Sequence, residues 1–161
     1  MEFLVSTFFG LALFFAAAAH AASCYTPAQF RAEQVVRLQT QLMMTSLLCP
    51  TAVAGVPSAY SAYLQFNQRH QNFVALQENL LLGFYRAQNV PQPERQLHTF
   101  KTNMANRLAT FAANRAPGVF CKAYGARLQQ AVRLTPVALQ IWGHQIALNR
   151  PSAYPVCGGV K

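Results

Sequence analysis

Residues 24–50 read CYTPAQFRAEQVVRLQTQLMMTSLLCP, a long stretch of helix-forming residues between two cysteines. Thr26-Pro27 is a typical helix start, because threonine caps the free amides of a first turn and proline fits the first helical position. Cys49-Pro50 ends the helix after about 22 residues. The spacing predicts an apolar face and a solvent-facing polar face, formed respectively by Phe30, Val35, Leu38 and Leu42 and by Arg31, Gln34, Arg37 and Gln41.

The rest of the chain repeats this pattern of helices separated by short breaks. Further helices are predicted over about 58–88, 94–114, 119–133 and 136–148. Because short connections join antiparallel neighbours, we expect an all-α fold, an antiparallel bundle of four to five helices. Residues 22–161 are expected to form one domain with an irregular tail, 149–161. In the longest helix the apolar stripe is expected to consist of Tyr63, Phe66, Phe73, Leu80 and Phe84.

The N-terminal segment has the pattern of a secretory signal peptide. An apolar run extends from Phe3 to Ala19, and Ala19-His20-Ala21 is a small-x-small cleavage site. We therefore expect residues 1–21 to be removed, which predicts a periplasmic or secreted protein. No later run is long and apolar enough to predict a membrane span, so none is expected after cleavage.

Two other interpretations of this segment stay open. The apolar run lacks a preceding Lys or Arg, and at about 17 residues it is at the lower limit for a retained membrane anchor. Alternatively, Cys24 is a candidate for lipid attachment of the bacterial lipoprotein kind, although Ala21 stands where leucine is usual.

The mature chain is strongly basic. All 13 Lys and Arg follow the predicted cleavage site, whereas the acidic residues that remain there are Glu33, Glu78 and Glu94, which gives a net charge of +10. Such a chain is attracted to anionic partners, and we expect an anionic envelope component or an acidic protein. Solubility alone is an equally simple reason for the charge.

The four cysteines predict two disulfides, because exported proteins meet an oxidising compartment. Cys24 and Cys49 flank a helix about 33 Å long, whereas a disulfide needs Cα atoms within about 7 Å. In an up-down bundle the first helix ends where the fourth begins, which predicts the pair Cys49–Cys121. Cys24 then pairs with Cys157 by elimination, since the irregular tail is long enough to reach back.

Several runs are similar to one protein family: residues 38–49, 60–66 and 100–106, and the pair Phe120-Cys121. They resemble an uncharacterised family of exported, all-helical bacterial proteins for which no activity is known. The resemblance covers the first four predicted helices and lies in spacing more than in identity; Phe100 stands where tyrosine is expected. It implies an exported helical domain with one cysteine ending the first helix and another opening the fourth, and it implies no activity.

Few residues are candidates for catalysis, since the mature chain has three Glu and no Asp. Nucleophilic triads need an acid that orients the base, and glycosidases need a carboxylate pair, so both classes are disfavoured. His98 and Lys101 are three residues apart in the third predicted helix, and His144 lies in the fifth. Together they are the candidate catalytic set of a phosphodiesterase or nuclease.

His70 is the candidate binding residue, because it falls on the apolar stripe of the longest helix between Phe66 and Phe73. A buried histidine with a structural hydrogen bond is the simpler interpretation. No histidine pair or HExxH motif has metal-binding spacing, so neither a metal nor another cofactor is expected. Asn103 and Asn106 are interpreted as buried polar residues that specify helix packing, or as ligand contacts.

These observations favour an exported, basic, disulfide-bonded helical binding or interaction module of the bacterial envelope, without catalytic activity. The alternatives are a phosphodiesterase- or nuclease-type hydrolase and a structural or chaperone-like envelope protein. A shared patch of Arg and His would favour the hydrolase, whereas an apolar pocket would favour ligand binding. A continuous exposed apolar stripe would favour a chaperone-like protein.

Overall fold

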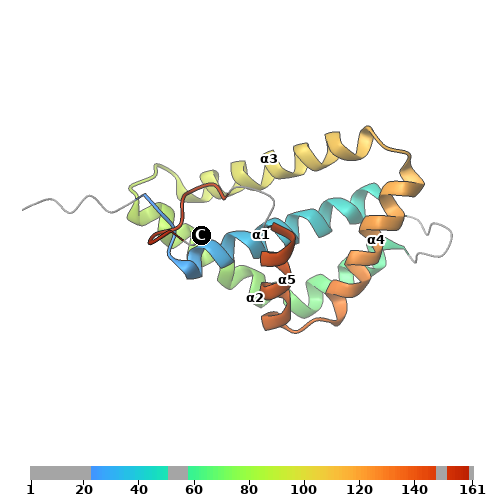
Figure 1. Ribbon diagram of the computed structural model, residues 1–161, viewed down its shortest axis with the longest axis horizontal. Helices are drawn as coiled ribbons and strands as arrows, with labels where there is room; N and C mark the ends of the chain where they lie inside the picture. The colour runs from blue at the N-terminus through green and yellow to red at the C-terminus, as the bar shows by residue number, and fades with distance from the viewer. Residues whose placement is uncertain (1–22, 51–57, 148–151, 160–161) are drawn as a thin grey trace, which may run out of the picture.

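The computed structural model describes residues 23–50, 58–147 and 152–159. The predicted all-α class is confirmed, and the only β pairing within these ranges is an isolated bridge between Tyr25 and Val156. The predicted signal peptide, residues 1–21, lies outside the described residues. The described residues form five helices (Figure 1): α1 (Pro27–Leu48), α2 (Ala59–Ala87), α3 (Pro93–Ala113), α4 (Pro117–Arg133) and α5 (Pro136–Ala147).

Proline opens four of the five helices, because its missing N–H is not needed in a first turn. Thr26 caps α1 as predicted: its Oγ1 accepts from the Gln29 amide at 3.3 Å, and the Gln29 side chain accepts from the Thr26 amide at 2.9 Å. The Thr135 hydroxyl caps α5 in the same way. α3 and α4 start at Pro93 and Pro117, slightly earlier than predicted, because each proline belongs to the helix and not to the break before it.

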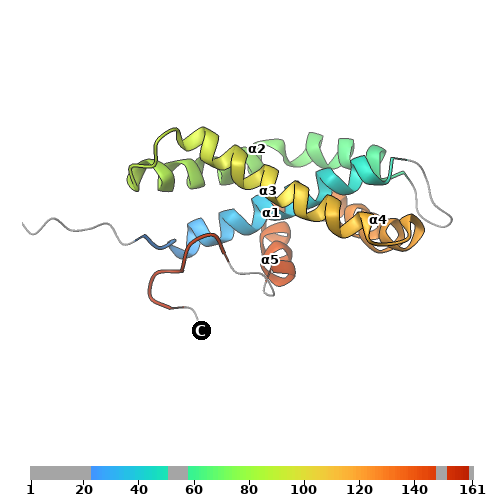
Figure 2. The same ribbon diagram turned by 90° about the horizontal axis from the view of Figure 1, so that it is seen from above.

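The first three helices run along the length of the molecule in alternating directions. Gln39 in the second half of α1 donates a hydrogen bond to Tyr63 near the start of α2, and Lys101 of α3 pairs with Glu78 of α2. α4 and α5 differ from the predicted antiparallel bundle, because both lie across the long axis (Figures 1 and 2). α4 crosses one end of the α1–α2 pair, and α5 crosses α1 near its middle.

α1 is the central helix, and the other four helices all pack against it. The predicted polar side of this helix therefore faces solvent only in part: Arg31 is exposed, whereas Gln34 is only 1% exposed and Arg37 is largely covered. Neighbours on nearly every side leave a helix little solvent-facing surface, whatever its sequence pattern. The buried polar side chains of α1 are Glu33, Gln34, Gln39, Thr40, Thr45 and Ser46.

Hydrogen bonds to the helix itself satisfy part of this buried polarity. The hydroxyls of Thr40, Thr45 and Ser46 donate to carbonyls of the preceding turn. The Gln34 amide group is buried without a hydrogen bond to any described residue. A buried polar group without a hydrogen bond costs free energy of folding. Burial of apolar surface elsewhere in the protein must offset this cost for the polar side chains of α1.

The core is divided into two hydrophobic clusters at opposite ends of α1. One surrounds the Cys49–Cys121 disulfide, and its large members are Leu38, Leu42, Phe66, Phe120, Leu128 and Leu139. The other contains Tyr25, Val36, Leu81, Phe84, Tyr85 and Leu97. Full burial of such a side chain contributes about 1.5–3 kcal/mol relative to leaving it exposed, so both clusters contribute strongly to stability.

The buried stripe of α2 follows a different line from the predicted one. Phe66 and Phe84 are buried as predicted, but Leu80 is 38% exposed and Phe73 is only partly covered. The stripe drifts because a straight helix completes a turn every 3.6 residues, and it passes through smaller and polar side chains. Its remaining members are Ala59, Ala62, His70, Val74, Gln77, Leu81 and Tyr85.

Both disulfides join the predicted partners. Cys49 at the end of α1 is bonded to Cys121 in the first turn of α4, with their Cα atoms 5.7 Å apart. Cys24, just before α1, is bonded to Cys157 of the C-terminal segment, with Cα atoms 5.1 Å apart. The first pair ties α4 across one end of the bundle, and the second returns the C-terminal segment to the other end.

Candidate ligand-binding groove

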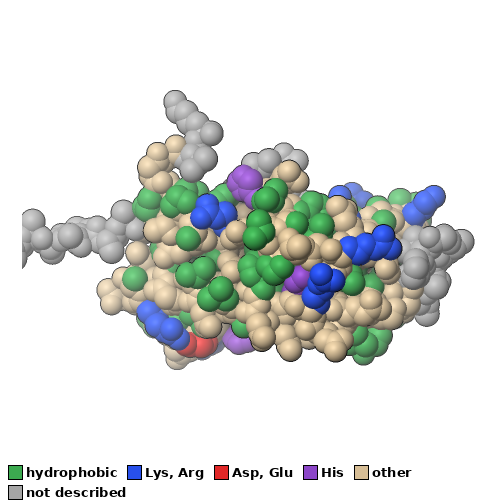
Figure 3. All heavy atoms as spheres, turned by 90° about the horizontal axis from the view of Figure 1, so that it is seen from below, with side chains coloured by type: hydrophobic (Ala, Val, Ile, Leu, Met, Phe, Trp, Pro, Cys, Tyr) green, Lys and Arg blue, Asp and Glu red, His purple; other side chains and the backbone are tan. Residues whose placement is uncertain are grey.

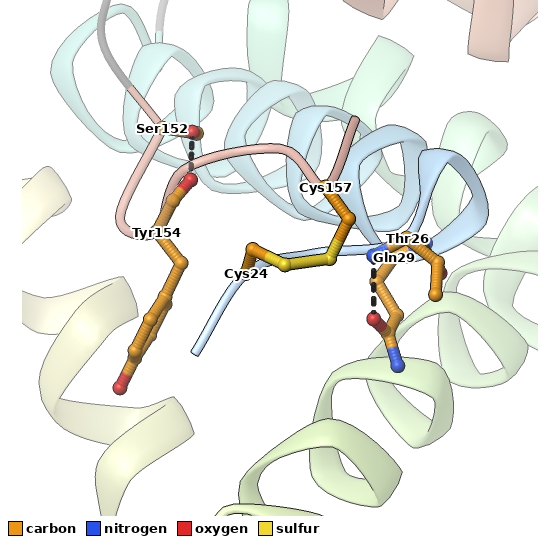
Figure 4. Close-up of a disulfide and its surroundings, with 6 residues drawn as sticks. All are labelled: Cys24, Thr26, Gln29, Ser152, Tyr154 and Cys157. Atoms are coloured by element: carbon orange, nitrogen blue, oxygen red, sulfur yellow. Dashed lines mark hydrogen bonds between the residues drawn. A yellow bond between two sulfur atoms is a disulfide. The ribbon is translucent and has the colours of Figure 1, made fainter. Parts of the chain in front are cut away.

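The C-terminal segment, residues 152–159, is attached to the residues before α1. Beside the Cys24–Cys157 disulfide, the Tyr25 amide donates to the Pro155 carbonyl at 2.7 Å, and the Cys157 amide donates to the Tyr25 carbonyl at 2.8 Å. Figure 4 shows this attachment next to the Thr26–Gln29 cap, with the Ser152 hydroxyl bonded to the Tyr154 carbonyl. Over these residues the predicted irregular tail forms no helix, and the disulfide and the two backbone hydrogen bonds hold it in place.

Aromatic packing holds the same segment against α2. The Tyr154 ring lies 4.8 Å from Phe84 and 5.2 Å from Tyr25, centroid to centroid, with edge-on geometry in both pairs. Tyr25 in turn lies 4.5 Å from Phe84 and is completely buried. Edge-on aromatic pairs add about 0.5–1.5 kcal/mol beyond area burial, so the segment has an anchor independent of the disulfide.

Glu33 connects the C-terminal segment to α1. Its carboxylate is fully buried and accepts the Ala153 amide at 2.9 and 3.2 Å and the Arg37 Nε at 2.6 Å. The negative charge also acts on the neighbouring Tyr25: burial raises the pKa of this phenol, and Glu33 raises it further. Glu33 therefore fixes the position of Ala153 and of the Arg37 guanidinium.

Arg37 lies at the base of a groove between α1, α3 and the C-terminal segment. Its guanidinium sits over the Phe100 ring at 5.0 Å from the centroid, and its Nη1 lies 3.8 Å from the Met104 sulfur. The groove has a volume of about 630 Å³, a size that suits a small-molecule ligand. We call it the α3 groove, and it is lined by Arg37, Gln96, Thr99, Phe100, Asn103, Arg107, Phe111 and Ala153.

One flank of α3 supplies most of this lining. Positions 96, 100, 103, 107 and 111 follow one another at intervals of three or four residues, and position 99 adjoins 100, so the lining lies on one side of the helix. Lys101 leaves the opposite flank toward α2, where its Nζ pairs with Glu78 at 2.6 Å. The α3 groove therefore opens on the side of α3 that faces away from α2.

The charge in this region is positive. The three glutamates of the described residues, Glu33, Glu78 and Glu94, are in ion pairs with Arg37, Lys101 and Arg86, respectively. Arg107 is exposed in the α3 groove and has no acidic partner among the described residues. Next to the groove, the Arg115 guanidinium lies 3.3 Å from the centroid of the Phe111 ring and donates to the Phe111 carbonyl.

Basic side chains are also present outside the groove. On the face shown in Figure 3, several Lys and Arg side chains lie toward one end of the molecule, and apolar side chains occupy much of the middle. In the α3 groove the positive charge has both polar and aromatic neighbours.

The structure does not bring the candidate catalytic residues together. His98 is exposed on α3, and Lys101 is engaged by Glu78. His144 of α5 packs edge-on against Phe30 of α1, with ring centroids 5.6 Å apart. No hydrogen bond or ring contact joins these three residues in the described ranges, so the geometry gives no shared acid–base centre.

His70 is buried in the helix bundle, as its position on the stripe predicted. It is 1% exposed, its ring lies 5.0 Å from Phe66, and neither ring nitrogen has a hydrogen-bond partner among the described residues. Burial lowers the pKa of this histidine, and the nearby charge of Arg69 lowers it further. The expected structural hydrogen bond is absent from the described residues, and His70 lies outside the α3 groove lining.

The described part of the chain contains neither a cluster of metal ligands nor a helix that could span a membrane. No three His, Cys, Asp or Glu residues there are grouped as metal ligands. None of the helices in the described ranges has the length and hydropathy needed to cross a membrane.

The sequence did not single out the α3 groove. The expected burial of Asn103 and Asn106 is wrong, because both are exposed. The sequence feature that could have indicated the groove is a row of polar residues, spaced three or four apart, beside Phe100 and Phe111. That row becomes a groove only because Arg37 and Ala153 approach from distant parts of the chain.

Comparisons with protein-family models, with curated proteins and with solved structures find no match to this chain. The resemblance to exported helical proteins therefore stays an expectation from sequence. Function has to be argued from the geometry alone.

Proposed function

We propose that the mature chain is an exported, non-catalytic binding module that holds a small ligand in the α3 groove. The observation that carries this proposal is the clamp beneath the groove, in which buried Glu33 orients Arg37 and fixes Ala153. Binding sites depend on polar groups held in place before the ligand arrives. A buried carboxylate that positions two groove-lining residues is an arrangement of this kind.

Export is supported by the predicted signal peptide and by the two disulfides, which persist in oxidising compartments. The disulfide also argues against the lipid-anchored alternative, because the Cys24 sulfur bonded to Cys157 has no valence left for a lipid. We propose a periplasmic or secreted location in a bacterial envelope, with an anionic envelope component as the partner. The intact mass of the exported protein should correspond to residues 22–161 with two disulfides, and a mass that includes residues 1–21 or a lipid would contradict export by cleavage.

The hydrolase alternative is weaker, because His98, Lys101 and His144 have different neighbours and none of them lines the α3 groove. A ligand-binding module needs no such acid–base centre. It needs a concave surface with a few convergent polar groups, as in the α3 groove.

The proposal is tested by capture of ligands from envelope extract. Mature, oxidised protein is used as bait, and bound proteins, lipids and small molecules are identified by mass spectrometry. Two variants, Asn103→Trp and Asn106→Trp, place the same bulky ring on exposed positions of α3, but only position 103 lines the groove. We expect a compound that is captured by the wild type and by Asn106→Trp and lost with Asn103→Trp. Equal capture by all three proteins would show that the groove is not the binding site.

A further inference from the structure

The α3 groove also indicates what kind of ligand it holds. Resting on the binding function proposed above, we propose that the ligand is a small amphiphilic anion. Its apolar body lies over Phe100 and Phe111, and its anionic head, a carboxylate, phosphate or sulfonate group, is bound by Arg107.

The apolar part of the proposal rests on the two phenylalanines. Phe100 and Phe111 are only partly buried although both belong to α3, whose other large apolar side chains Leu97, Met104 and Leu108 are buried. They line the groove three helical turns apart. The guanidinium groups of Arg37 and Arg115 lie over these two rings and cover part of each, so a ligand would contact the ring surface that remains open, next to a cation.

The anionic part rests on the charge balance of the groove. The positive charge of Arg37 is largely neutralised, because its Nε lies 2.6 Å from the buried carboxylate of Glu33. Arg107 has no such partner among the described residues, and Glu78 and Glu94 are engaged with Lys101 and Arg86. The guanidinium has a planar array of donors that matches carboxylate and phosphate oxygens. An anionic head group of the ligand would neutralise the positive charge of Arg107, which no glutamate of the described residues neutralises.

The polar lining and the size of the groove restrict the ligand further. Asn103 lies between the two phenylalanines along α3, and Thr99 lies directly before Phe100; they offer an amide and a hydroxyl for orientation. A volume of about 630 Å³ falls within the range of sites for single small molecules. These features favour a compact ligand over a polymer, because a nucleic acid strand would need basic residues repeated beyond the groove.

The test uses two fluorescent probes with the same aromatic rings. 1-Anilinonaphthalene-8-sulfonate carries an anionic group, and N-phenyl-1-naphthylamine lacks it. Mature, oxidised protein is titrated with each probe, together with Arg107→Gln, Asn103→Trp and the charge-matched control Arg69→Gln, a residue of α2 outside the groove. Near-UV circular dichroism checks that each variant keeps its tertiary packing.

We expect saturable binding of the sulfonate at one site and weaker binding of the neutral probe. Arg107→Gln should weaken sulfonate binding about tenfold, the effect of losing one hydrogen bond to a charged group, and should leave the neutral probe unchanged. Arg69→Gln should change neither. Asn103→Trp should weaken both probes, because it fills the groove.

Two results would overturn the inference in different ways. If Asn103→Trp weakens both probes but Arg107→Gln has no effect on the sulfonate, the groove binds ligands and the anionic head is wrong. If Asn103→Trp affects neither probe, the α3 groove is not the site of these probes, and the ligand class proposed for it is wrong. In the second case the capture experiment decides separately whether the groove binds anything.

Discussion

The carboxylate of Glu33 accepts hydrogen bonds from Arg37, one turn away, and from Ala153, 120 residues away. A single side chain therefore couples the central helix to the C-terminal segment and defines the base of the α3 groove. This role was not visible in the sequence, where Glu33 was only one of three remaining acidic residues. Neither the burial of α1 nor the return of Ala153 follows from the local pattern around position 33.

Replacing Glu33 by Gln should strongly destabilise the protein. Arg37 would lose its carboxylate partner in a position where its side chain is only 13% exposed, and breaking a buried ion pair from one side costs about 3–5 kcal/mol. Urea unfolding of the oxidised mature protein measures the change. Glu94→Gln is the matched control, because the Arg86–Glu94 pair is well exposed and its loss should hardly change the unfolding midpoint. Similar midpoints for the two variants would show that the Glu33 clamp does not stabilise the fold.

His70 should make the stability depend on pH. Burial lowers its folded-state pKa below the usual value of 6.5, so the unfolded chain binds the proton more tightly. The contribution of the neutral ring is fully present above about pH 6.5 and is lost as the pH falls from there through the lowered folded-state pKa, because protonation then favours unfolding.

The pH effect is measured as the free energy of unfolding between about pH 8 and about pH 5. His70→Gln should lower the slope of stability against pH, and His98→Asn, a change at an exposed histidine of α3, should leave the slope as in the wild type. A wild-type slope in His70→Gln would assign the pH dependence to other groups.

At the scale of the elements, the sequence predicted helix starts better than helix faces. Thr26 caps its helix as predicted, because capping depends on residues within one turn, and Thr135 caps α5 in the same way. The faces of α1 and α2 were misjudged at Gln34 and Leu80, because a face is set by the number and position of neighbouring helices. Those neighbours are distant in sequence, so periodicity alone could not identify a central helix with a polar interior.

The crossing of α5 over α1 gives a test of this packing. A Cβ added at Gly143 would lie 3.4 Å from the Gln34 carbonyl oxygen and 3.7 Å from a Leu38 methyl group, whereas one added at Gly83 of α2 meets nothing within 4 Å. Gly83→Ala should stabilise the protein by about 0.5–1 kcal/mol through helix propensity. Gly143→Leu should destabilise it by about 1–3 kcal/mol through overpacking. Thermal unfolding compares the two, and a stabilising Gly143→Leu would contradict the close contact between α5 and α1.

At the scale of the whole molecule, the sequence predicted the class and the disulfide pairs but not the shape. The pairing of Cys49 with Cys121 required only that the end of α1 and the start of α4 meet, which holds although α4 crosses the bundle. The transverse directions of α4 and α5 depend on packing against α1. The α3 groove depends on the same long-range assembly, since its lining comes from α1, α3 and the C-terminal segment.

The central claim is that the α3 groove is where this protein binds its ligand. The most direct measurement is a map of backbone amide NMR shifts in the oxidised mature protein titrated with 1-anilinonaphthalene-8-sulfonate. We expect the largest shifts at Thr99, Phe100, Asn103 and Arg107 of α3 and at Ala153, whose amide is held by Glu33. Shifts centred instead on the exposed apolar residues of α5, such as Val137 and Ile141, with no change at Ala153, would contradict the claim.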